Sequence, residues 1–93
     1  MHLTNQTFDE IQIGDLVTDT RTLSKRDTQL FAILTGDLNP AHLDEEFAKN
    51  DIFHHIVGHG MWTGSIFSAL LGTKLPGPGT IYLSQTLKFL HPV

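Results

Sequence analysis

The decapeptide TGDLNPAHLD, residues 35–44, is the stretch around which the rest of the chain is arranged. It places a carboxylate, Asp37, and an imidazole, His42, five residues apart in a polar loop. A helical pattern ends at Gly36, and the Asn39-Pro40 pair restricts the backbone between the two titratable groups. We predict that Asp37 and His42 act together on one water molecule.

Composition excludes several classes of protein. The 93 residues, 40% hydrophobic and 17% charged, predict one globular domain with a small core. The net charge of −4 and the scattered Lys and Arg residues argue against nucleic acid as a partner. There is no cysteine for a disulfide or a thiolate metal site, and no apolar run approaches the ~20 residues of a membrane helix. A cytoplasmic protein is expected.

Two or three helices are predicted. The first follows Ser24, which with Asp27 forms a variant of the capping box, and ends at Thr35-Gly36. Asp44 caps a short second helix over residues 45–49. The third runs from about residue 59 or 60 to 71 and ends at Gly72. It is apolar but contains several small residues, which is typical of a helix wrapped by a sheet.

Two segments are predicted to be strands, which makes the chain α+β. Residues 8–23 read as extended, and residues 80–91 alternate apolar and polar side chains after a Pro-Gly turn at 75–79. Two strands cannot cover an apolar helix. Either several copies assemble, or the chain stops before its fold is complete.

Four motifs occur in a fixed order: TGDxNPxHxD (35–44), HGM (59–61), SxxSxLLG (65–72) and LPGPGxIYLxQxLxFxxPV (75–93). Together they resemble the R-specific enoyl-CoA hydratases, the MaoC-like dehydratase group, over about residues 24–93. The resemblance implies a hot-dog fold, in which a curved antiparallel sheet wraps a central helix, here residues 60–71. It also implies a homodimer or a higher homo-oligomer.

The resemblance bears on the extent of the chain as well. Family members continue past the Pro-Val at 92–93 with about three further strands, so residues 1–93 are expected to form the N-terminal part of a single MaoC-like domain. Members fused to a phosphate acetyl- or butyryltransferase are the closest match, judged by Phe53-His54, HGMW at 59–62 and the Pro-Gly-Pro-Gly turn.

The hydration of a trans-2-enoyl thioester requires a water activated at C3, a proton for C2 and a donor for the thioester oxygen. Asp37 and His42 would hold the water, and Asn39 would fix the loop by Asx-type bonding. The resemblance assigns the backbone N–H of Gly60 to the thioester oxygen. The alternatives are a turn aspartate, a surface histidine and a turn glycine.

Two supporting residues and one metal hypothesis complete the candidate site. The resemblance implies that Ser68 supports the site, although packing explains a serine there equally well. His55 and His59 have the i, i+4 spacing of metal ligands, but Gly58 interrupts any helix through both and no third ligand is evident. We expect no metal, and we expect His59 to bond locally before Gly60.

The expected activity is hydration of trans-2-enoyl-CoA to (R)-3-hydroxyacyl-CoA, with no cofactor and with coenzyme A as part of the substrate. A second hypothesis is a non-catalytic module that binds acyl thioesters or a partner domain. A third, a hot-dog thioesterase, is distant, because residues 60–71 contain no carboxylate to activate water.

Overall fold

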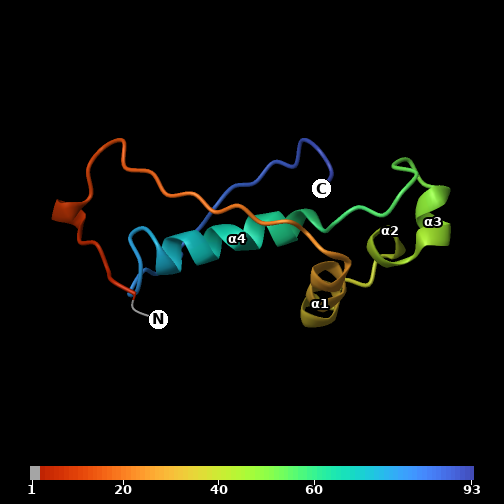
Figure 1. The fold of residues 1–93 in the computed structure, drawn as a ribbon, viewed down its shortest axis with the longest axis horizontal. Helices are drawn as coiled ribbons and strands as arrows, with labels where there is room; N and C mark the ends of the chain where they lie inside the picture. Colours follow the sequence, from red (N-terminus) through yellow and green to blue (C-terminus); the bar gives the residue numbers. More distant parts are fainter. Residues whose placement is uncertain (1–2) are drawn as a thin grey trace. The chain divides into compact units, whose positions relative to one another are not determined.

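The structure is a computed structural model, and it describes residues 3–93. The described chain forms two compact units. One comprises the residues up to Arg21 together with Gly64–Leu87, and the other comprises Thr22–Thr63 together with Lys88–Val93. Helix α4 (Gly60–Thr73; Figure 1) contributes residues to both units. The prediction of a single MaoC-like domain therefore stays a prediction.

In the second unit, helix α1 (Lys25–Thr35) begins as predicted. The Ser24 hydroxyl accepts a hydrogen bond from the Asp27 N–H at 3.0 Å, and the Asp27 carboxylate accepts one from the Ser24 N–H at 3.1 Å. These two bonds satisfy N–H groups that have no partner within the helix. The buried side chains of this unit are few, namely Thr28, Ala32, Ala48, Val57 and His59.

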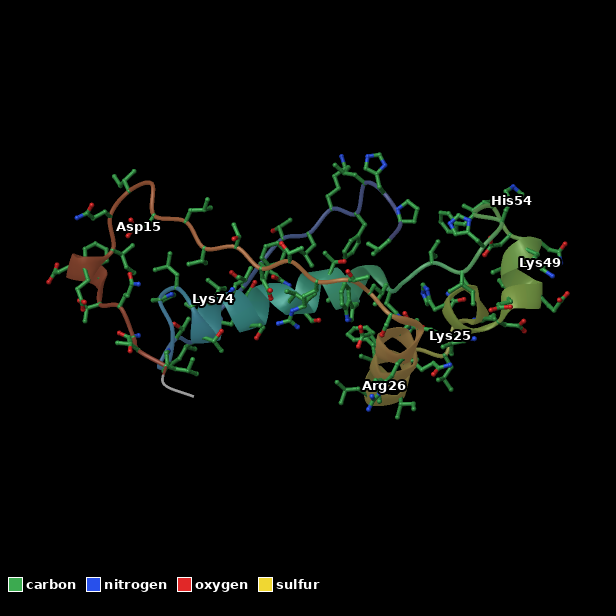
Figure 2. All side chains as sticks on the ribbon, viewed as in Figure 1. Asp15, Lys25, Arg26, Lys49, His54 and Lys74 are labelled. Atoms are coloured by element: carbon green, nitrogen blue, oxygen red, sulfur yellow. The ribbon has the colours of Figure 1, made fainter. Side chains whose placement is uncertain are left out.

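Helices α2 (Pro40–Leu43) and α3 (Glu45–Lys49) follow α1 in the same unit. The Asp44 carboxylate caps α3 as predicted, since it accepts hydrogen bonds from the Glu46 and Phe47 N–H groups. At the other end of α3, Lys49 pairs with Glu46 at 3.2 Å, and its position beside His54 can be followed in Figure 2. The single turn α2 lies within a segment that the sequence predicts as loop, so that prediction is wrong for residues 40–43.

The first unit is held by bonds between residues far apart in sequence. The Gln6 N–H donates to the Pro76 carbonyl at 2.7 Å, and the Lys74 ammonium donates to the Thr18 carbonyl at 2.7 Å. Gly77 has φ +97°, and a Cβ there would lie 2.6 Å from the Thr4 carbonyl oxygen. Only glycine suits this predicted turn, because it tolerates both the left-handed backbone and the close approach.

Helix α4 is two residues longer than predicted. It runs through Gly72 to Thr73, whose hydroxyl donates back to the Ala69 carbonyl at 2.6 Å. Gly72 was expected to stop the helix, but a glycine inside a helix costs only about 1 kcal/mol and can be tolerated. None of the helices in residues 3–93 has the length and apolar character needed to cross a bilayer.

No β-strand forms among the described residues, in contrast to the prediction for residues 8–23 and 80–91. Phe8–Glu10 forms a single 3₁₀ turn, η1, and residues 80–93 are a trace without arrows in Figure 1. A strand exists only when its N–H and C=O groups meet a neighbouring strand. Ile81 and Leu83 are accordingly exposed, to 80% and 91%.

Candidate functional site

The C-terminus of α1 places Asp37 at the start of the candidate site. Gly36 adopts the left-handed conformation, with φ +79°, and its N–H donates to the Ala32 carbonyl at 2.9 Å. The Asp37 N–H donates to the Thr35 hydroxyl at 3.2 Å. The helix therefore ends sharply, and the Asp37 side chain emerges with about half of its surface exposed to solvent.

Two side-chain oxygens then fix the loop from within. Asp37 Oδ1 accepts a hydrogen bond from the Asn39 N–H at 3.2 Å, and Asn39 Oδ1 accepts one from the Ala41 N–H at 3.0 Å. Asn39 thereby caps α2, and Pro40 takes the first helical position, which needs no donor. The predicted Asx-type role of Asn39 is confirmed. His42 lies two residues after Pro40 on the same short helix.

The His42 ring is oriented by a backbone carbonyl. Its Nδ1 lies 2.7 Å from the Val57 carbonyl oxygen, and a carbonyl can only accept, so Nδ1 carries the proton that is donated. In the neutral ring the Nε2 lone pair is then free to accept a proton. A second bond, from the Val57 N–H to the Ala41 carbonyl at 3.3 Å, holds the same segments together.

His59 is the buried member of the site, with 2% of its surface exposed. Its Nε2 lies 3.0 Å from the Asp37 carbonyl oxygen, and its ring centroid lies 3.9 Å from that of His42 and 5.0 Å from that of Phe31. The prediction of a local hydrogen bond is therefore wrong, because the acceptor lies 22 residues away. Local spacing gave no signal for this contact.

Gly60 begins α4, and its N–H has no partner within the helix. The Trp62 N–H donates to the His59 carbonyl at 3.0 Å and closes the first turn. A Cβ on Gly60 would lie 3.0–3.2 Å from the Phe89 ring. A glycine is therefore needed to let this aromatic ring reach the helix start.

These groups line one cavity of about 680 Å³, formed entirely within the second unit. Its wall brings together the three predicted residues Asp37, His42 and Gly60 with His59. The rest of the wall is largely apolar and is made by Phe53, Val57, Gly58, Met61, Thr63 and residues 88–93. An apolar cavity with a few convergent polar groups is the usual form of a small-molecule site.

Most of the other candidate residues lie outside the cavity wall. Ser68 is exposed on α4 and is not among the residues that line the cavity. Of the three large side chains near the start of α4, Met61 lines the cavity, whereas Trp62 and Phe67 do not. Neither Val57 nor residues 88–93 were assigned to the site from the sequence. Val57 acts through its backbone, and the final segment reaches the site only through folding, with the Gly58 N–H donating to the Val93 carbonyl at 2.7 Å.

The structure assembles a different potential metal set from the one considered above. One ligand atom each from Asp37, His42 and His59 lie within 4.8 Å of one another. The rings of His42 and His59 are stacked, with centroids 3.9 Å apart and planes tilted by 31°. His42 Nδ1 and His59 Nε2 also face carbonyl oxygens. One nitrogen of each ring is therefore engaged in a hydrogen bond, and a metal-free reaction stays a prediction.

Three of the known proteins that this chain resembles are named as hydratases or dehydratases. An (R)-specific enoyl-CoA hydratase of Rhodospirillum rubrum is 45% identical over 86 residues, which cover 92% of this chain and 60% of the relative. A 3-hydroxybutyryl-CoA dehydratase of Methylorubrum extorquens is 44% identical over 92% of this chain and 55% of its own. The unliganded R-hydratase of Pseudomonas aeruginosa superposes with a TM-score of 0.91, at 45% identity, over 98% of this chain and 59% of that structure.

The chain thus spans a little over half the length of the relatives it matches. Its backbone follows that of a solved R-hydratase almost throughout, so the two share a fold over this length. A family model described as the MaoC like domain matches residues 10–93. This chain belongs to the MaoC-like domain family.

Proposed function

We propose that the protein adds water to a trans-2-enoyl-CoA to give (R)-3-hydroxyacyl-CoA. The observation that carries the proposal is the meeting of Asp37, His42 and Gly60 at the wall of one cavity. The relatives named above as hydratases and as a dehydratase support the same reaction in its two directions. The R stereochemistry follows the name of the Rhodospirillum rubrum relative.

In this mechanism the Asp37 carboxylate and His42 Nε2 hold one water above C3 of the enoyl group. His42 accepts a proton as the water oxygen bonds to C3, and its Nδ1–H bond to Val57 keeps Nε2 the basic atom. The C2–C3 double bond opens toward C2, and charge accumulates on the thioester oxygen, where the Gly60 N–H stabilises it. His42 then gives this proton to C2, which returns the ring to its starting state, so the product contains all the atoms of one water.

The test is the loss of ultraviolet absorbance as crotonyl-CoA, a short conjugated thioester, is hydrated. We expect Asp37→Asn and His42→Ala each to lower kcat/KM by about 10²–10⁴-fold, the usual contribution of a general acid–base group. Asp9→Asn and His55→Ala are matched controls, because both residues are exposed and lie outside the cavity wall. Full activity in either site variant would refute the assigned roles.

A non-catalytic acyl-thioester module is the alternative, and one further measurement separates it. Titration with butyryl-CoA, which has no double bond to hydrate, reports binding alone. Binding without turnover of crotonyl-CoA favours the module. Release of free thiol from either compound would instead support the thioesterase hypothesis.

The finer fold is proposed as well. We infer that residues 11–23 and 80–91 become strands of a hot-dog sheet around α4, and that the protein is a homodimer. The exposure of Ile81 and Leu83 supports this, because alternating apolar side chains are normally covered. Solution mass and circular dichroism test both points. A cytoplasmic location and a fused transferase domain stay predictions.

A further inference from the structure

We propose that His59 is a positioning residue that holds the Asp37–His42 pair in register with the Gly60 N–H, and that it does so as the neutral Nε2–H tautomer. This inference rests on the proposed hydration. It adds one requirement to the proposed reaction: a hydrogen bond donated by His59 Nε2 to the Asp37 carbonyl in the catalytic loop.

The first step concerns the contacts of the ring. His59 Nε2 lies 3.0 Å from the carbonyl oxygen of Asp37, and 3.9 Å from the carboxylate oxygen Oδ2 of the same residue. The bond is therefore to the backbone, and the Asp37 carboxylate stays available on the cavity side. Because the His59 ring is also packed against that of His42, one side chain touches both members of the pair.

The second step concerns the proton on the ring. A carbonyl oxygen accepts only, so a favourable 3.0 Å contact requires the hydrogen on Nε2. Nδ1 is buried and has no hydrogen-bond partner among the described residues. A second proton there would leave a buried N–H without an acceptor, directly beside the ring that gains a proton during the reaction. The geometry therefore favours a neutral His59.

The third step joins this ring to the oxyanion donor. The His59 carbonyl accepts the Trp62 N–H at 3.0 Å, so its backbone forms part of the first turn of α4, and Gly60 is its immediate neighbour. The ring fixes the catalytic loop while the backbone fixes the helix start. A displacement of about 1 Å in such an arrangement can cost about 10²-fold in rate.

Three variants separate the donor from the ring. Gln places its amide nitrogen near the position of Nε2, Asn places it near that of Nδ1, and Phe keeps an aromatic ring against His42 with no donor. We expect His59→Gln to retain kcat within about tenfold of the natural protein. His59→Asn and His59→Phe should lower kcat by about 10²-fold, with KM changed by less than about threefold, because the effect lies in alignment.

Circular dichroism and thermal unfolding of each variant show whether it folds. Equal losses of kcat in three folded variants, or a loss confined to KM, would overturn the proposal. A second measurement needs no variant: ¹⁵N–¹H NMR of the imidazole nitrogens in the natural protein should show His59 protonated at Nε2 alone. The Nδ1–H tautomer or a doubly protonated ring would overturn it.

The same spectra distinguish the two proposals. Absence of crotonyl-CoA hydration together with an Nε2–H His59 would reject the proposed function and leave the bond to Asp37 standing. Hydration together with the other tautomer would reject only the role of His59. In a folded His59→Phe protein, the backbone NMR signals of Asp37 and Leu38 should shift, since the bond to that carbonyl is gone.

Discussion

Residues 24–49 and residues 80–91 differ in where their hydrogen-bond partners lie. In the first segment each capping side chain accepts a hydrogen bond from an N–H two or three residues away: Ser24 from Asp27, Asn39 from Ala41 and Asp44 from Phe47. The second segment is extended, and its backbone would need a neighbouring strand. A helix can thus be complete in a short chain, whereas a strand depends on residues elsewhere.

Gly60→Ala tests the contact between the start of α4 and Phe89 in the extended segment. The added methyl group would lie 3.0–3.2 Å from the Phe89 ring, which comes from the extended segment. We expect crotonyl-CoA hydration to fall by about 10²–10³-fold, because the crowding would displace the residue-60 N–H from the thioester oxygen. If crowding by Phe89 is the cause, Gly60→Ala combined with Phe89→Leu should recover part of the rate. No recovery would indicate that the methyl group itself blocks the substrate.

Amide hydrogen exchange of the 93-residue chain measures how well the backbone hydrogen bonds of the two segments are protected. The Gly36 N–H, bonded to the Ala32 carbonyl, should exchange at least about tenfold more slowly than the amides of Ile81 and Leu83. Equal protection of the two sets would contradict the comparison. It would also show that residues 80–91 have found a strand partner, for example in a second copy of the chain.

Ser24→Ala against Ser84→Ala compares one serine from each segment. Loss of the Ser24 cap should lower the free energy of unfolding by about 1 kcal/mol, because the Asp27 N–H loses its acceptor. Ser84 is exposed in the extended segment, and its replacement should change stability by less than about 0.5 kcal/mol. Urea denaturation followed by circular dichroism measures both. A larger effect at Ser84 would place that residue in a structured sheet.

Glu10 gives the smallest expected effect. The Thr7 hydroxyl and N–H both donate to its carboxylate, and these bonds hold the pKa of Glu10 below its ordinary value of 4.5. A lowered pKa in the folded state stabilises the fold above pH 4.5, and this contribution disappears as the pH falls through the lowered value. Because Glu10 is fully exposed, Glu10→Gln should only slightly flatten the acid limb of stability against pH. A steeper limb in the variant would contradict this.

The same difference explains what the sequence could predict. Ser24, Asp27, Gly36 and Asp44 act on neighbours a few residues away, so the beginnings and ends of α1 and α3 were readable. The family motifs located Asp37, His42 and Gly60, which the structure places at one cavity. The contact of His59 with Asp37 crosses 22 residues and has no local signature. The strands were predicted from alternating apolar and polar side chains. That alternation shows which side chains share one face of a strand, but it does not identify the neighbouring strand that must pair with it.

One consequence follows from the two carbonyl contacts of His42 and His59. Asp37 and His42 are held by contacts from residues 57 and 59, while the turn at residues 50–52 contributes no side chain to the cavity wall. That turn lies outside the hydrogen bonds that fix residues 37–42. A change in its length would therefore leave the spacing of Asp37 and His42 unaltered. The interval from Asp37 to His42 has no such freedom, since one inserted residue would break the Asx bonds that space the pair. Natural insertions in this part of the domain should therefore collect at residues 50–52 and avoid residues 37–42.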